Sequence, residues 1–424
     1  MGWGLELCLI GLVLLFLLAS GQWIIFSLGI AGMVGIMLSG GLQGLQPLGY
    51  VIWNSCNNFN LTAIPLFILM GELILQSGVS DKFYRSLGIW FHRIPGGLLQ
   101  VNIMASALFA SLTGVSVASA AALGTVAIPS QKKQGYDHPM IFGSLTGGGA
   151  LAILIPPSIP LIIYGAMTEN SIVKLFMAGI IPGLILSALF MVYIFVRVYM
   201  NPALTPKEDA IHPWQVKIAG LKDILPILVI ALIVLLGIYY GLTTPTEAGA
   251  VGALCAFVLG WYNSGKAWWV HFKIALNNSI KTTCMLLSIM VGAQILAFSL
   301  VSTGINRDMT EWIVSFQLPK YGFLAAVYIV YLILGCFMDP ISILLLTLPI
   351  VYPIITALGF SPIWFGIILV VLIEIGLLTP PVGMNLFIIH GISGGSSFED
   401  VVHGSIPYIV IMILFLVALS FFQF

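Results

Sequence analysis

Charged residues are the scarcest class in this sequence. Of the 424 residues only 7% are charged, and 15 basic residues balance 15 acidic ones. With 60% hydrophobic residues and a mean hydropathy of +1.10, this composition is typical of a membrane protein and excludes a soluble globular domain. A net charge of zero also offers no basic surface, so we expect no nucleic-acid partner.

The sequence also lacks the common signatures of enzymes and of metal sites. It has no HExxH motif, and it has no P-loop at the glycines of 147–149, because they are not followed by Lys and Ser or Thr. The cysteines form no CxxC pair and no Cys/His set, and we interpret them as free, buried residues. They are Cys8, Cys56, Cys255, Cys284 and Cys336. We therefore expect no enzymatic activity, no cofactor and no metal site of the His/Cys type.

Apolar runs divide the chain into two similar halves and predict an all-α integral membrane protein. The halves are expected at 1–200 and 223–424, joined by an interfacial linker at 201–222. The first half is predicted to hold scaffold spans at 1–77, a pair of short apolar runs at 98–129, an interrupted run at 139–167 and a span at 175–199. The second is predicted to repeat this order with scaffold spans at 224–300, short runs at 322–357, an interrupted run at 361–391 and a span at 405–424.

The paired short runs predict re-entrant helical hairpins. Each run has roughly 15 residues, whereas a helix needs roughly 20 to cross a bilayer. Basic residues flank the first hairpin, so the positive-inside rule places its open end in the cytoplasm. Following the spans from there leaves three basic residues outside, Lys174, Arg307 and Lys320. The second hairpin then enters from the opposite face, which predicts two inverted repeats.

Prolines interrupt one apolar run in each half. Proline has no N–H and displaces the carbonyl four residues before it, so Pro156 frees the C=O of Ala152 and Pro380 frees that of Gly376. Such freed groups persist at membrane depth only where protein or a watered cavity surrounds them. Two broken helices in matching positions are typical of the binding centre of a secondary transporter.

Carbonyls and small hydroxyls at the hairpin tips and helix breaks suit a sodium ion, and helix N-termini there suit an anion. The predicted sodium-binding residues are Thr113, Ser116, Ala152, Ile155, Ser158, Gly335, Asp339, Gly376, Thr379 and Val382. The predicted substrate-binding residues are Ser116, Pro157, Ser158, Thr379 and Asn385. The alternative is that these small residues serve helix packing.

Two acidic residues belong to the predicted membrane interior of the second half. Asp339 follows the second hairpin tip, where it either contributes to a cation site or caps the next helix. Glu374 precedes the second break by six residues, and we expect it to support the shape of that broken helix through a hydrogen bond.

The motifs resemble one known family. Thr243-Thr-Pro-Thr-Glu-Ala248, Ile155-Pro-Pro-Ser-Ile159, Thr168-Glu-Asn-Ser-Ile172, Gly335-Cys-Phe-Met-Asp339 and the run from Glu374 to Leu386 are similar to the large membrane subunit of tripartite ATP-independent periplasmic (TRAP) transporters. The resemblance implies a multi-pass permease of the bacterial inner membrane with an elevator-type transport domain. It also implies sodium-coupled import of an organic acid, a carboxylate or sulfonate. The implied partners are a small four-span membrane subunit and a periplasmic substrate-binding protein.

One position departs from the family pattern, because many relatives have an acidic residue where this chain has Ser119. The alternative function is a stand-alone proton-coupled carrier or antiporter, with Asp339 or Glu374 carrying the proton. A channel-like or purely structural membrane subunit is a weaker interpretation, since neither needs two inverted pairs of broken helices.

Overall fold

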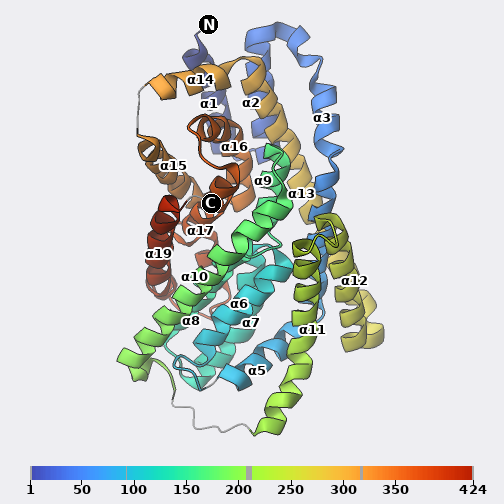
Figure 1. The fold of residues 1–424 in the computed structure, drawn as a ribbon, viewed down its shortest axis with the longest axis vertical. Coiled ribbons are helices and arrows are strands. Elements are labelled where there is room, and N and C mark those ends of the chain that lie inside the picture. The colour runs from blue at the N-terminus through green and yellow to red at the C-terminus, as the bar shows by residue number, and fades with distance from the viewer. Residues whose placement is uncertain (1, 92, 207–212, 316–318, 423–424) are drawn as a thin grey trace.

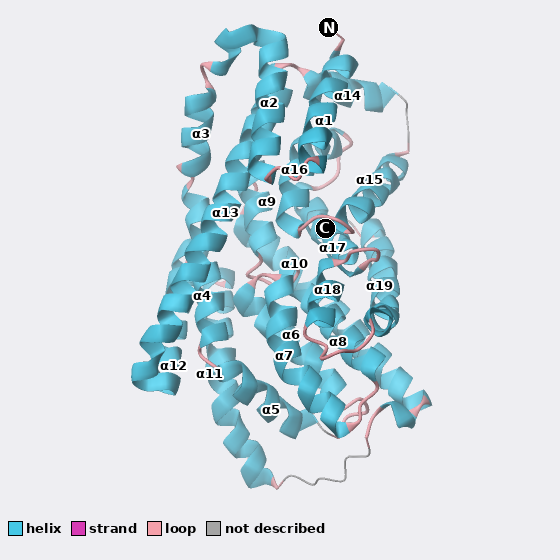
Figure 2. Cartoon of the chain, turned by 180° about the vertical axis from the view of Figure 1, so that it is seen from behind, coloured by secondary structure: helices cyan, strands magenta, loops and turns pink. Residues whose placement is uncertain are grey.

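The computed structural model describes residues 2–91, 93–206, 213–315 and 319–422. These residues form helices joined by turns and contain no strand, as Figure 2 shows. Within the described residues, seven helical segments are long and apolar enough to cross a membrane. The all-helical class predicted from composition is therefore confirmed.

The first half of the chain contains ten α-helices. They are α1 (Trp3–Ala19), α2 (Ile24–Gly40), α3 (Leu48–Cys56), α4 (Ala63–Gln76), α5 (Val79–Phe91), α6 (Leu98–Thr113), α7 (Ser116–Gln134), α8 (His138–Ala150), α9 (Ile159–Thr168) and α10 (Ile172–Met200). Short 3₁₀-helices join some of them, namely η1 (Gly41–Leu45), η2 (Phe59–Thr62), η3 (Leu151–Ile153) and η4 (Pro202–Leu204).

The second half repeats the order of helix types. It contains α11 (Trp214–Tyr239), α12 (Pro245–Ser264), η5 (Gly265–Ala267), α13 (Trp268–Ser302), α14 (Ile305–Ser315), α15 (Lys320–Gly335), α16 (Pro340–Ala357), α17 (Pro362–Leu378), α18 (Met384–Gly391) and α19 (Phe398–Phe421). The hairpins are thus α6 with α7 and α15 with α16, and the broken helices are α8 with α9 and α17 with α18.

The amphipathic helix before each hairpin shows that the two halves are inverted. Helix α5 leads into the first hairpin and lies at the lower end of the molecule in Figure 1, while α14 leads into the second and lies at the upper end. Figure 2 gives the same placement from behind. The two hairpins are therefore entered from opposite ends of the molecule, as expected for inverted repeats.

Short polar residues set the starts of the helices around the two breaks. Ser158 accepts a hydrogen bond from Leu161 N at the start of α9, and Ser361 accepts one from Trp364 N at the start of α17. Asp137 and Asp339 cap α8 and α16 in the same way. Each such cap is worth about 1 kcal/mol, and it satisfies an N–H that lipid would leave without a partner.

Three helices extend further than the sequence predicts. Helix α13 runs unbroken from Trp268 to Ser302, past the end of the scaffold spans expected at 224–300, because no glycine or proline interrupts it before Gly292. Helix α11 begins at Trp214, inside the expected linker, and α19 begins at Phe398, after its Ser397 cap. Residues 207–212 of the linker lie outside the described residues.

The expectation of buried cysteines is wrong for most of them. All five are free, but only Cys336 is buried; Cys8, Cys56 and Cys284 are exposed. Cys8 lies on the apolar helix α1, Cys284 on α13 and Cys56 at the end of the short helix α3.

Two groups of helices pack closely. Helix α13 lies along α2 and α4, and α4 also contacts α12; α8 contacts α6, α7 and α19. The contact of α8 with α19 depends on two glycines, since a Cβ at Gly143 would lie 1.9 Å from Gly404 O and one at Gly404 would lie 2.0 Å from Pro139 O. Small residues permit this close approach of membrane helices.

We expect Gly143→Ala to destabilise the protein by roughly 1–3 kcal/mol, because the added methyl group forces α8 and α19 apart. Gly11→Ala is the matched control, since a Cβ at Gly11 in α1 meets nothing within 4 Å. There alanine should be neutral or stabilise by up to about 1 kcal/mol through helix propensity. Thermal unfolding in detergent measures both variants, and equal melting temperatures would contradict this account of the helix contact.

Candidate substrate and ion site

Two hairpin tips and two helix breaks form the candidate site. The first tip joins α6 to α7 at Thr113–Ser116, and the first break lies between Ala150 and Ile159. The second tip joins α15 to α16 at 336–339, and the second break lies between Leu378 and Met384. Each break contains a cis peptide bond, Pro156–Pro157 and Pro380–Pro381.

The first tip and the first break touch through their backbones. Ile159 N donates to Gly114 O at 3.4 Å. Gly114 has a φ of +62°, and a Cβ there would lie 2.7 Å from Pro157 O. Thr113 Oγ1 lies 2.6 Å from Ser119 Oγ within the tip. Glycine at 114 thus allows both the left-handed turn and the close approach.

The first-half residues predicted to bind ions are all enclosed by protein. The exposed fractions are 3% for Thr113, 1% for Ser116, 0% for Ala152, 8% for Ile155 and 0% for Ser158. Irregular backbone at membrane depth is therefore shielded from lipid here, as membrane physics requires. The structure brings this half of the predicted set together.

The second tip and the second break form an equivalent contact. Gly383 N donates to Cys336 O at 3.3 Å. Gly335 and Gly376 meet backbone to backbone, because a Cβ on Gly376 would lie 2.4 Å from Gly335 Cα. This second centre is more open, since Pro380 and Pro381 are exposed and Thr379 is half-buried.

Several second-half groups already have hydrogen bonds within their own element. Gly376 O, which Pro380 was expected to leave free, accepts from Thr379 N at 3.0 Å. Thr379 Oγ1 donates to Ile375 O at 2.6 Å. The Asp339 carboxylate caps α16 by accepting from Ile341 N and Ser342 N, so the capping alternative describes its geometry. Each oxygen still has lone pairs to offer an ion, and all three residues remain predictions as sodium ligands.

A hydrogen-bonded group joins the first hairpin to the second broken helix. Ser116 Oγ donates to Glu374 Oε2 at 3.2 Å and accepts from Asn385 Nδ2 at 2.7 Å. All three side chains are at most 1% exposed. The hydrogen-bond partner of Glu374 thus belongs to the other repeat and not to its own broken helix, and the role of Glu374 as a structural support stays a prediction. No sequence signal gives this pairing, which spans 258 residues.

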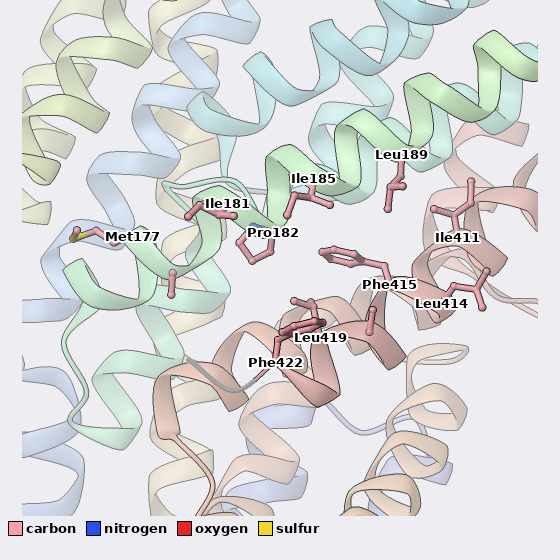
Figure 3. A pocket seen from close by; sticks show the side chains of 12 residues that line it. Met177, Ile181, Pro182, Ile185, Leu189, Ile411, Leu414, Phe415, Leu419 and Phe422 are labelled. Atoms are coloured by element: carbon pink, nitrogen blue, oxygen red, sulfur yellow. The ribbon is translucent and has the colours of Figure 1, made fainter.

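An apolar groove of about 730 Å³ lies away from these residues, between α10 and α19. Figure 3 shows side chains such as Ile181, Ile185 and Phe415 converging on it from the two helices. Its lining has no charged group and no side-chain amide or hydroxyl, so it offers nothing to recognise an organic acid. We therefore do not place the substrate there.

A more polar cleft of about 500 Å³ lies between α3, α13 and the end of α9. Its lining includes Asn54, Asn58, Glu169 and Gln294. Helix α9 runs from the first break to this cleft, so the cleft lies one helix length from the enclosed centre. Glu169 ends α9 with a φ of 56° and is the one described non-glycine residue with positive φ.

Comparison with known proteins decides the family. The model of the DctM component of the tripartite ATP-independent periplasmic transporter matches residues 11–423. The chain belongs to this family. It is a TRAP transporter large permease, a multi-pass membrane protein and not an enzyme.

Individual relatives cover almost the whole permease. It is 36% identical to the C4-dicarboxylate TRAP transporter large permease protein DctM of Pseudomonas aeruginosa, over 93% of this chain and 91% of that one. It is 30% identical to the sialic acid TRAP transporter large permease protein SiaM of Vibrio cholerae, over 96% and 94%. Among solved structures, the Alcanivorax borkumensis YdaH transporter shares the fold with a TM-score of 0.58 and 16% identity, over 91% and 89%.

We expect Gly114→Ala in the permease to destabilise the contact between the first tip and the first break. Alanine costs roughly 1 kcal/mol in a left-handed conformation, and its Cβ would in addition crowd Pro157 O. Gly135→Ala is the matched control, because Gly135 has a φ of +87° with nothing within 4 Å. Thermal unfolding should show a larger decrease in melting temperature for Gly114→Ala than for Gly135→Ala. Similar decreases would mean that the contact between the added Cβ and Pro157 O does not destabilise the protein.

Proposed function

We propose that the permease is the large subunit of a sodium-coupled secondary transporter of the bacterial inner membrane. It imports a small organic acid that a periplasmic binding protein delivers, and it works with a small four-span membrane subunit. The observation that supports this most is the meeting of both repeats at Ser116, which joins the first hairpin tip to the second broken helix. Transporters built from inverted repeats bind substrate where such broken helices meet.

Sodium would be held by backbone carbonyls and hydroxyls at the two centres. The first centre would use the enclosed set at Thr113, Ser116, Ala152, Ile155 and Ser158; the second would use Gly335, Asp339, Gly376, Thr379 and Val382. Oxygen ligands at broken helices replace the water around a small cation. No Lys or Arg belongs to either set, so the charge balance for an anionic substrate would come from the bound sodium.

The substrate would bind beside these ions, at Ser116, Pro157, Ser158, Thr379 and Asn385. The first residues of α9 follow Ser158 and those of α18 follow Gly383, so two helix N-termini adjoin the breaks. Helix N-termini and hydroxyls suit the oxygens of a carboxylate or sulfonate. The relatives named for C4-dicarboxylate and for sialic acid both handle carboxylates, which supports an organic acid as the substrate class.

Movement would follow an elevator scheme, in which the hairpins and broken helices carry the site across the membrane against the remaining scaffold. The close contacts between each tip and its own break support motion of these elements as one body. Helices α2, α4, α12 and α13, which pack together, supply the scaffold in this scheme.

Reconstitution of the permease with its small subunit in liposomes tests this function. Uptake should require the binding protein, rise with an imposed sodium gradient and persist when the proton gradient is collapsed. Uptake that follows the proton gradient in sodium-free buffer would instead establish the stand-alone proton-coupled carrier as the function.

Thr379→Val separates a hydroxyl ligand from helix packing in the second centre. Valine keeps the β-branched shape and removes only the oxygen, so the sodium concentration for half-maximal uptake should rise. One lost polar contact in a protein interior is worth roughly 1–3 kcal/mol, which is about 5- to 150-fold in affinity. Unaltered sodium dependence with normal assembly would remove the Thr379 hydroxyl from the ligand set.

A further inference from the structure

The Ser116 group contains two oxygen atoms that its hydrogen bonds leave without a partner. Glu374 Oε1 and Asn385 Oδ1 are both buried, and neither has a hydrogen-bond partner among the described residues. The other polar atom of each side chain contacts Ser116 Oγ. Both unpartnered oxygens therefore belong to groups fixed around one hydroxyl.

Burial makes these atoms costly unless a ligand supplies the partner that each of them lacks. Glu374 is 1% exposed and Asn385 is 0% exposed. An acceptor without a partner costs several kcal/mol at membrane depth, and a charged carboxylate costs more. Two ion pairs, Arg307 with Glu311 and His403 with Glu399, lie on exposed surfaces away from Glu374. Nothing basic among the described residues offsets Glu374.

We propose that Glu374 and Asn385 bind a monovalent cation between the first hairpin and the second broken helix. Glu374 Oε1 supplies the negative charge and Asn385 Oδ1 supplies a neutral oxygen, the ligand type that small hard cations prefer. Ser116 Oγ holds both side chains in place and acts as a positioning residue. This position adjoins the first centre, with which it shares Ser116, but its two oxygen ligands come from the second repeat.

The proposed cation would link the two repeats. Ser116 begins α7, whereas Glu374 lies in α17 and Asn385 in α18. A cation there neutralises the carboxylate and lets α17 and α18 stay against the first hairpin, which makes the occupied state of the transport body compact. The inference rests on the proposed function only in that sodium is the cation to be tested.

Sodium binding to the purified complex of permease and small subunit tests this assignment without transport. Binding of radioactive sodium counts the ions, and thermal unfolding in sodium chloride, with choline chloride holding ionic strength, gives the affinity. In Glu374→Gln the charge is lost and the shape is kept, so we expect one ion fewer at saturation. We also expect the half-stabilising sodium concentration to rise by about 10-fold or more.

The control is Glu72→Gln in α4, because Glu72 also accepts a hydrogen bond from an asparagine, Asn278, at 3.1 Å. This pair lies between the scaffold helices α4 and α13. The number of bound sodium ions and the sodium affinity should therefore stay as in the unaltered protein. If Glu374→Gln does not fold, Glu374→Asp is tested in its place. Aspartate keeps the negative charge, but its side chain is one methylene shorter, so the carboxylate lies nearer to the backbone of α17. That variant should change the preference among lithium, sodium and potassium.

The outcomes separate the two proposals. The Glu374 site is overturned if Glu374→Gln leaves the number of bound sodium ions and the sodium affinity unchanged, or if Glu374→Asp leaves the cation preference unchanged. Sodium coupling would still stand after either result. A proton held by Glu374 in place of a cation would explain such a result. Absence of sodium binding to the unaltered complex overturns the sodium-coupled function itself. Loss of one bound sodium ion in both Glu374→Gln and Asn385→Leu supports the site.

Discussion

The demand for hydrogen-bond partners in lipid is the constraint on which this structure depends. A continuous membrane helix satisfies its own backbone, but the prolines at 156, 157, 380 and 381 remove that option in two places. The protein answers by setting a hairpin tip against each break, where Ile159 N reaches Gly114 O and Gly383 N reaches Cys336 O. Each hairpin tip thus supplies hydrogen-bond partners for the broken helix of its own repeat. The same contacts bring together backbone carbonyl and N–H groups, which are the groups that the proposed ion and substrate sites would use.

Glycine makes this arrangement sterically possible. At the second centre Gly335 and Gly376 meet with no side chain between them, and at the first Gly114 fits under Pro157. Only the backbone can come this near to another backbone, so the close contacts expose carbonyls and N–H groups to the space between the elements. The chemistry of the site is therefore mainly that of the main chain, with a few hydroxyls, one amide and the carboxylates of Asp339 and Glu374 added.

The sequence predicts the fold well because its strongest signals are local. Run lengths and prolines locate both hairpins and both breaks. Longer-range features are not predictable in this way. The Ser116 group depends on residues more than 250 positions apart. The exposure of Cys8 and Cys284 depends on which helix surfaces face lipid.

Duplication has given the chain two centres of similar build, but they differ in how a solute can reach them. The first is closed on all sides by protein, whereas Pro380, Pro381 and the side chain of Phe337, which is 63% exposed, leave the second within reach. Under the proposed function, two chemically alike positions with unequal access would fill and empty at different speeds. The order in which the two centres are occupied would then depend on how easily a solute reaches each of them. Two repeats with similar oxygen ligands could therefore bind first and second in the transport cycle without any difference in those ligands.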